Sequence, residues 1–128
     1  MSDYESLDVW RKSMNLAEEI YKLTAKFPKT ETYALSDQMK RAAVSIPSNI
    51  SEGQARNTDK DTAKFLYIAR GSKAELETQL HLAVRLGFVT VNDAKYAFLL
   101  LKDVGMMING FLRRVKSFND GESITQNS

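Results

Sequence analysis

The sequence predicts an all-α protein, an up-down-up-down four-helix bundle formed by residues 1–118. Apolar residues recur at spacings of three and four along four long segments, and no segment alternates apolar and polar residues with the period of two that strands show. Short runs of turn residues separate the four segments, as in bundles whose neighbouring helices are antiparallel. A chain of 128 residues is long enough for one such domain with a buried core.

The first two helices are separated by a Phe27-Pro28 pair, because the residue before a proline is pushed out of the helical region. The second helix is expected to run to Gly53 with Pro47 inside it. A proline inside a helix removes one backbone hydrogen bond, so the helix either breaks or bends there. The apolar stripe keeps its phase through Ile50, which favours a kink at Pro47 over a break.

The last two helices each begin with a Thr-x-x-Asp pattern, in which the threonine side chain caps the first turn. Thr58 and Asp61 mark the start of the third helix, and Thr90 and Asp93 mark the start of the fourth. The final ten residues, 119–128, are polar and are expected to form a flexible tail.

The fourth helix carries two apolar seams side by side, whereas a bundle core needs one. One seam comprises Ala94, Phe98, Leu101, Gly105, Ile108, Leu112 and Val115. The second seam comprises Ala97, Leu100, Val104, Met107 and Phe111. Either both seams face one wide core, or the second seam is a contact between copies of the chain, since water would otherwise meet a large apolar patch.

A polar stripe runs along the second helix beside its apolar face. It comprises Gln38, Arg41, Ser45, Asn49 and Glu52, and the third helix has a matching set of Gly71, Ser72, Glu75 and Gln79. If the two faces meet, Arg41 would pair with Glu75, and Ser45, Asn49 and Ser72 would satisfy one another. Gly71 would then allow close backbone approach. The alternative is a polar face in contact with water.

The sequence lacks the residues that catalysis or metal binding would need. It has no cysteine and a single histidine, His81, and Thr78 stands where a Glu-x-x-His metal motif would need glutamate. One histidine cannot provide two metal ligands, and the sequence has no Ser-His-Asp set and no glycine-rich phosphate loop. We therefore expect no catalytic residues, no metal, no cofactor and no enzymatic activity.

Basic residues form several small clusters, although the net charge is only +2. The candidates for contacts with nucleic acid are Lys22, Lys26, Lys40, Arg56, Lys60 and Lys64. Such residues near helix C-termini also complement the helix dipole, which is the structural alternative. In an oligomer each copy would repeat its basic patch, and binding to phosphates would be salt-dependent and tolerant of sequence.

No apolar run approaches the roughly 20 residues that cross a bilayer, and the N-terminus has no basic start followed by an apolar region. We expect no membrane partner and a cytoplasmic location.

Three long stretches carry a resemblance to a known family. They are LDVWRKSMNLAEEIYKLT (7–24), FPKTETYALSDQMKRAAVSIPSNISEG (27–53) and FLYIARGSKAELETQL (65–80). The chain resembles the small four-helix bundle proteins encoded by intervening sequences within bacterial 23S ribosomal RNA genes. It is also similar to the accessory protein of diversity-generating retroelements, which works with a reverse transcriptase and binds nucleic acid.

The resemblance implies a homo-oligomer, a closed five-fold ring in known relatives, which favours the second seam as an oligomer contact. It also implies that the polar stripe is a structural or interface network. We therefore expect an oligomeric, non-enzymatic bundle that binds structured RNA or DNA, or a nucleic-acid enzyme, through repeated basic patches. The alternative is a scaffold that binds only proteins.

Overall fold

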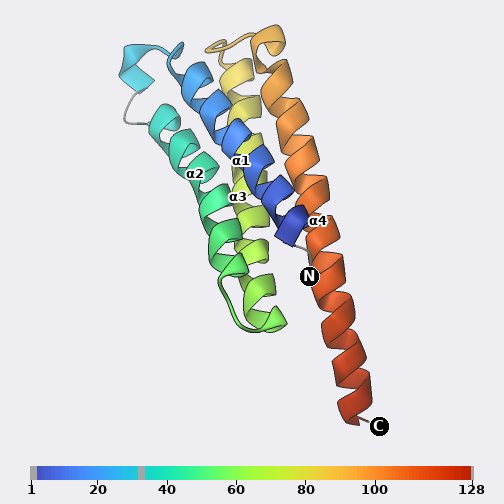
Figure 1. Cartoon of the computed structure of the whole chain (residues 1–128). Coiled ribbons are helices and arrows are strands. Elements are labelled where there is room, and N and C mark those ends of the chain that lie inside the picture. The colour runs from blue at the N-terminus through green and yellow to red at the C-terminus, as the bar shows by residue number, and fades with distance from the viewer. Residues whose placement is uncertain (1–2, 32–33, 128) are drawn as a thin grey trace.

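The protein is an all-α bundle of four helices, as predicted (Figure 1). This computed structural model describes residues 3–31 and 34–127, with side chains described for 8–30 and 34–115. The elements are α1 (Asp3–Thr24), the 3₁₀-helix η1 (Lys29–Glu31), α2 (Leu35–Gln54), α3 (Asp59–Arg85) and α4 (Val91–Asn127). The predicted tail, residues 119–128, lies outside the residues whose side chains are described.

Each helix packs against two others, so the four form a closed bundle. The packed pairs are α1 with α2, α2 with α3, α3 with α4, and α4 with α1. Apolar side chains from all four helices fill the centre, and the largest fully buried ones include Leu16, Met39, Leu80 and Phe111. Burial of this apolar surface is the main source of stability for helices of this length.

Pro47 is buried inside α2, and the helix continues through it to Gln54. The expectation of an uninterrupted helix is therefore confirmed. A bend at Pro47 stays a prediction, based on the hydrogen bond that the proline cannot donate to the carbonyl of Ala43.

The predicted caps form at both helix starts. The Thr58 hydroxyl accepts a hydrogen bond from the backbone N–H of Asp61 at 3.2 Å, and Thr90 does the same for Asp93 at 3.0 Å. At the end of α3, Gly87 has a φ of 77°, a left-handed conformation that glycine adopts without strain. Threonine caps and a glycine stop thus set the turns on either side of α3.

The close approach between α2 and α3 occurs at Gly53, whereas the sequence predicted it at Gly71. A Cβ atom at Gly53 would lie 3.3 Å from the carbonyl oxygen of Thr62, whose hydroxyl donates to the Gly53 carbonyl at 2.9 Å. A Cβ atom at Gly71 would meet nothing within 4 Å. Gly71 lies on the exposed side of α3, so it does not set the helix spacing.

Candidate interaction surfaces

The second apolar seam of α4 belongs to the bundle core, which corrects the prediction of an oligomer contact there. Its members are buried within the single chain, apart from the half-buried Met107: Ala97, Leu100, Val104, Met107 and Phe111. The first seam is also largely buried. Because α4 packs between α1 and α3, a wide strip of its surface faces the core, and both seams fit into that strip.

The centre of the predicted polar stripe does join α2 to α3. The hydroxyl oxygens of Ser45 and Ser72 are 2.8 Å apart, a hydrogen bond between the helices. The Asn49 side-chain amide donates to the Ser45 carbonyl at 2.8 Å and to the Ser45 hydroxyl at 3.0 Å. These half-buried groups satisfy one another, so the stripe's centre works as a structural network inside one chain.

The charged members of the stripe pair differently from the prediction. Arg41 pairs with Asp37, one turn earlier on α2, at 3.0 Å, and its side chain is 80% exposed. Glu75 accepts a hydrogen bond from the Gln79 amide at 3.2 Å. The predicted Arg41–Glu75 pair is therefore wrong for the single chain, because each side chain reaches a partner on its own helix in contact with water.

The two ends of the stripe lie at the surface. Gln38 and Glu52 are exposed, and Glu52 pairs with Arg56 at 2.7 Å. In the matching set on α3, Gln79 is buried, and its side-chain oxygen has no hydrogen-bond partner among the described residues.

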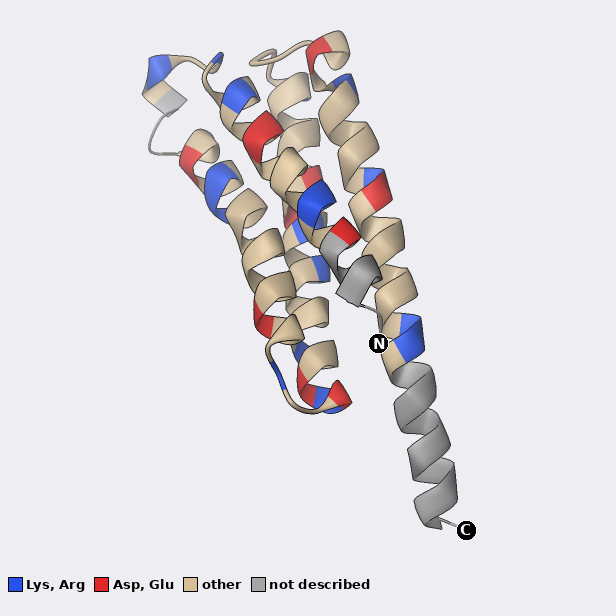
Figure 2. Ribbon diagram, in the orientation of Figure 1, with Lys and Arg blue, Asp and Glu red and all other residues tan. Residues whose placement is uncertain are grey.

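The six basic residues predicted to contact nucleic acid lie near opposite ends of the bundle. Lys and Arg are spread over the ribbon and do not gather in one place in the view of Figure 2. Of the six, those near the junction of α1 and α2 are Lys22, Lys26 and Lys40, and those near the turn between α2 and α3 are Arg56, Lys60 and Lys64. Residues 40 and 56 lie on either side of most of α2, which separates them by about 24 Å at about 1.5 Å of helix length per residue. The structure therefore does not bring the six into one patch.

Several of these cations already have partners. Lys26 pairs with Asp93 at 3.5 Å, and Arg56 pairs with Glu52. Lys40 lies over the ring of Tyr21, with its Nζ 5.4 Å from the ring centroid. Paired cations attract phosphate less, because the neighbouring carboxylate offsets their field.

The structure brings together a basic surface that the sequence analysis did not predict as one surface. No acidic residue occurs in residues 62–74 of α3 or in residues 104–115 of α4. The two stretches lie beside each other, since the Arg70 guanidinium donates to the Asn109 side-chain oxygen at 3.2 Å. We call five exposed or half-buried residues of these stretches the α3–α4 basic face: Tyr67, Arg70, Lys73, Asn109 and Arg113.

Two contacts hold the side chains of this face in place. The Arg70 guanidinium lies over the Tyr67 ring, 4.9 Å from its centroid. The Lys73 chain lies across α4 at Gly105, where a Cβ atom would be 3.0 Å from the lysine Cε, and its Nζ is 3.4 Å from Glu77. Arg70 is thus exposed and held by its neighbours, which lowers the entropy it would lose on binding an anion.

The two acidic residues in the described part of α4 pair with lysines of α1 and of the turn that follows it. Asp93 pairs with Lys26, and Asp103 pairs with Lys12 at 3.4 Å. Hydrogen bonding from Thr90, together with the Lys26 ammonium, holds the pKa of Asp93 below its usual range. The outer side of α4 is left with cations and no carboxylate among its described side chains.

The described residues contain no group of three potential metal ligands. The single histidine, His81, packs on Phe98 with the ring centroids 4.5 Å apart. Among the described helices, none combines the length and apolar character that crossing a membrane requires.

The fold is a four-helix bundle with a basic surface where α3 and α4 meet. The chain belongs to the family of 23S rRNA-intervening sequence proteins, which its sequence matches over residues 5–110. A comparison with curated proteins finds no match. Among solved structures, a protein of unknown function from the S23 ribosomal protein family of Bacteroides thetaiotaomicron is similar in fold. Its TM-score is 0.79 at 22% identity, covering 85% of this chain and 98% of that chain.

Proposed function

We propose that the protein is a non-enzymatic, self-associating cytoplasmic bundle that binds structured nucleic acid through the α3–α4 basic face. The observation that supports this proposal is the pairing of two acid-free stretches, 62–74 and 104–115, across one helix–helix contact. They contain Lys64, Arg70, Lys73, Arg113 and Arg114. Arg70 has no carboxylate partner among the described residues and donates to Asn109, whereas Arg41 and Arg56 on α2 and its C-terminal turn pair with carboxylates.

The chemistry of the face suits phosphate contacts. Arginine binds phosphate through a planar fork of donors, and Arg70 is exposed beside the amide of Asn109, a further hydrogen-bonding group. The face lies on two packed helices, and its described residues include no protruding helix or loop that could enter a groove and contact the bases. Binding is therefore expected to follow the shape and charge of the phosphate backbone and to depend weakly on base sequence.

Self-association is part of the proposal, because each added copy repeats the basic face and the fields of the copies add. Membership of the family supports this step through the resemblance to ring-forming relatives. With the second α4 seam buried in the core, the contact between copies must use side chains on the surface. Light scattering on the purified chain gives the mass of the assembly, and a monomer at all concentrations would remove this step.

The test of nucleic-acid binding compares two charge reversals by fluorescence anisotropy. The variant Arg70→Glu/Arg113→Glu changes the basic face, and Lys22→Glu/Lys40→Glu changes the same charge at the junction of α1 and α2. The variant Arg70→Glu/Arg113→Glu is expected to weaken binding to a labelled RNA hairpin at least about tenfold. It is also expected to lower the slope of the logarithm of the binding constant against the logarithm of the salt concentration by about 2. The variant Lys22→Glu/Lys40→Glu is expected to change binding only slightly.

Equal weakening by both variants would place the contacts outside the α3–α4 basic face. The absence of any binding at low salt would contradict the proposed function. It would favour the alternative, a scaffold that binds only proteins, which the exposed Leu99 and Met106 side chains of α4 support independently.

A further inference from the structure

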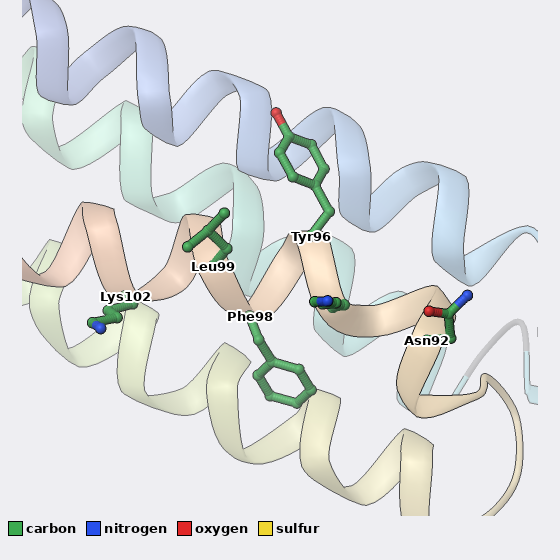
Figure 3. A pocket seen from close by; sticks show the side chains of 6 residues that line it. Asn92, Tyr96, Phe98, Leu99 and Lys102 are labelled. Atoms are coloured by element: carbon green, nitrogen blue, oxygen red, sulfur yellow. The ribbon is translucent and has the colours of Figure 1, made fainter.

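The outer side of α4 carries exposed apolar side chains toward the start of the helix. Tyr96 is 51% exposed, Leu99 is 53% exposed and Met106 is 63% exposed. A shallow depression of about 620 Å³ on α4 is lined by Asn92, Lys95, Tyr96, Phe98, Leu99 and Lys102 (Figure 3). We call Lys95, Tyr96, Leu99, Lys102 and Met106 the Leu99 patch.

The patch has the spacing of a helix-docking seam. Asn92, Lys95, Leu99, Lys102 and Met106 follow one another at intervals of three, four, three and four residues, so they form one row along the helix. Such a row presents alternating ridges and gaps that accept the side chains of a second helix packed alongside. Within the described bundle, the row has no helix packed on it, since α4 contacts only α1 and α3.

The charge of the patch specifies its partner. Lys95 and Lys102 stand on either side of Leu99 along the row. The α4 carboxylates that could offset them are paired elsewhere, Asp103 with Lys12 of α1 and Asp93 with Lys26 in the turn after α1. An occupant needs apolar side chains to cover Leu99 and Met106 and carboxylates to meet the two ammonium groups. A nucleic acid supplies the anions but leaves the apolar side chains uncovered.

We propose that the Leu99 patch binds an amphipathic helix of a partner protein, one whose apolar stripe is flanked by glutamate or aspartate. This goes beyond nucleic-acid binding and places a second interaction on the same helix, next to the α3–α4 basic face. The mode is helix packing in a shallow groove, with apolar anchors at helical spacing and charge pairing at the edges.

The test uses a displayed library of 18-residue helical peptides. Each peptide has leucine fixed at one helical stripe, and the flanking positions vary among glutamate, lysine and glutamine. Selection on the wild-type protein is expected to enrich glutamate at the flanks. The selected peptides should bind Leu99→Ser about tenfold more weakly or worse, since central apolar anchors dominate such contacts. Val44→Ser, which removes a 43%-exposed apolar side chain from α2, is the matched control and should bind normally.

A charge swap makes the test specific. The variant Lys95→Glu/Lys102→Glu is expected to select lysine-flanked peptides in place of glutamate-flanked ones. No enrichment, enrichment without charge preference, or equal binding to Leu99→Ser would each overturn the proposal. A fall in the mass of the protein in solution for Leu99→Ser would identify a second copy of the chain as the occupant. Loss of RNA binding by the same variant would identify nucleic acid as the occupant. Either result would overturn the proposal. Circular dichroism confirms that the variants are folded.

Discussion

Helix α3 borders two surfaces that differ in how their polar groups are used. On the α2 side, Ser45 and Ser72 bond across the contact, and Arg41 pairs with Asp37 on its own helix. On the α4 side, Arg70 and Arg113 are exposed in a region without carboxylates, and Leu99 and Met106 face water. Ser45, Asn49 and Ser72 of the first surface bond to one another, whereas the second surface exposes cations and apolar side chains to water. A conspicuous polar pattern in the sequence therefore corresponds to contacts inside the bundle, and we propose that the interaction surface lies on the α4 side.

The largest expected effect separates the two sides of α4. Leu100 is 2% exposed and its neighbour Leu99 is 53% exposed. Leu100→Glu places an unpaired carboxylate in the core and should lower the free energy of unfolding by more than about 4 kcal/mol. Leu99→Glu should change it by less than about 0.5 kcal/mol. Urea denaturation of both variants measures this difference, and similar stabilities would mean that α4 is rotated relative to this structure.

An intermediate effect is expected on the α2 side. Ser72→Ala removes the hydrogen bond to Ser45 and should cost about 1 kcal/mol. A double-mutant cycle with Ser45→Ala should give a coupling energy of about 0.5–1 kcal/mol, since the two hydroxyls act as one pair. Additive single effects would show that the two serines do not bond across the contact.

A small effect is expected for Arg41→Ala, within about 0.5 kcal/mol, because its ion pair with Asp37 is solvent-exposed. If Arg41 and Glu75 formed a buried pair, the same change would cost roughly 3–5 kcal/mol. Chemical denaturation distinguishes the two values. The larger value would mean that Arg41 and Glu75 form a buried pair and that the polar stripe is a buried network.

The smallest effect is a pH dependence at the start of α4. The pKa of Asp93 is lowered in the folded state by its hydrogen bond with Thr90 and by Lys26. A lowered pKa means that the ionised carboxylate stabilises the fold above the ordinary aspartate pKa and loses this contribution as the pH falls. Asp93→Asn should therefore be slightly less stable than the wild type at pH 7 and equally stable in strong acid. A difference that persists in acid would contradict this origin.

Local chemistry made much of the fold predictable. The Thr58 and Thr90 caps and the continuous second helix follow from spacing and capping, which depend on residues close in sequence. The Ser45–Ser72 contact joins residues on two helices, and the sequence predicted it only on the condition that the two polar faces meet. The role of the second α4 seam did not follow, because periodicity defines faces without saying how wide the core is. Two seams on adjacent sides of α4 merged into one buried strip once α1 and α3 packed on it.

The candidate site was harder to predict for a related reason. Single basic residues such as Lys26 and Arg56 stand out in the sequence, but their carboxylate partners do not. Lys26 meets Asp93 only in the fold, and Arg56 pairs with Glu52 one helical turn earlier. The α3–α4 basic face depends on the antiparallel register that sets Arg70 against Asn109, 39 positions along the chain. A search for acid-free stretches on neighbouring helices would have found it.

The central claim is that the α4 side of the bundle, and not the α2 side, binds partners. Its most direct test is the affinity of the purified protein for a labelled RNA hairpin and for duplex DNA. The variants Arg70→Glu/Arg113→Glu and Lys22→Glu/Lys40→Glu are compared with the wild type at low and high salt. We predict salt-sensitive binding that the first variant weakens at least about tenfold and the second leaves nearly unchanged. Binding that survives the first variant at full strength would contradict the account.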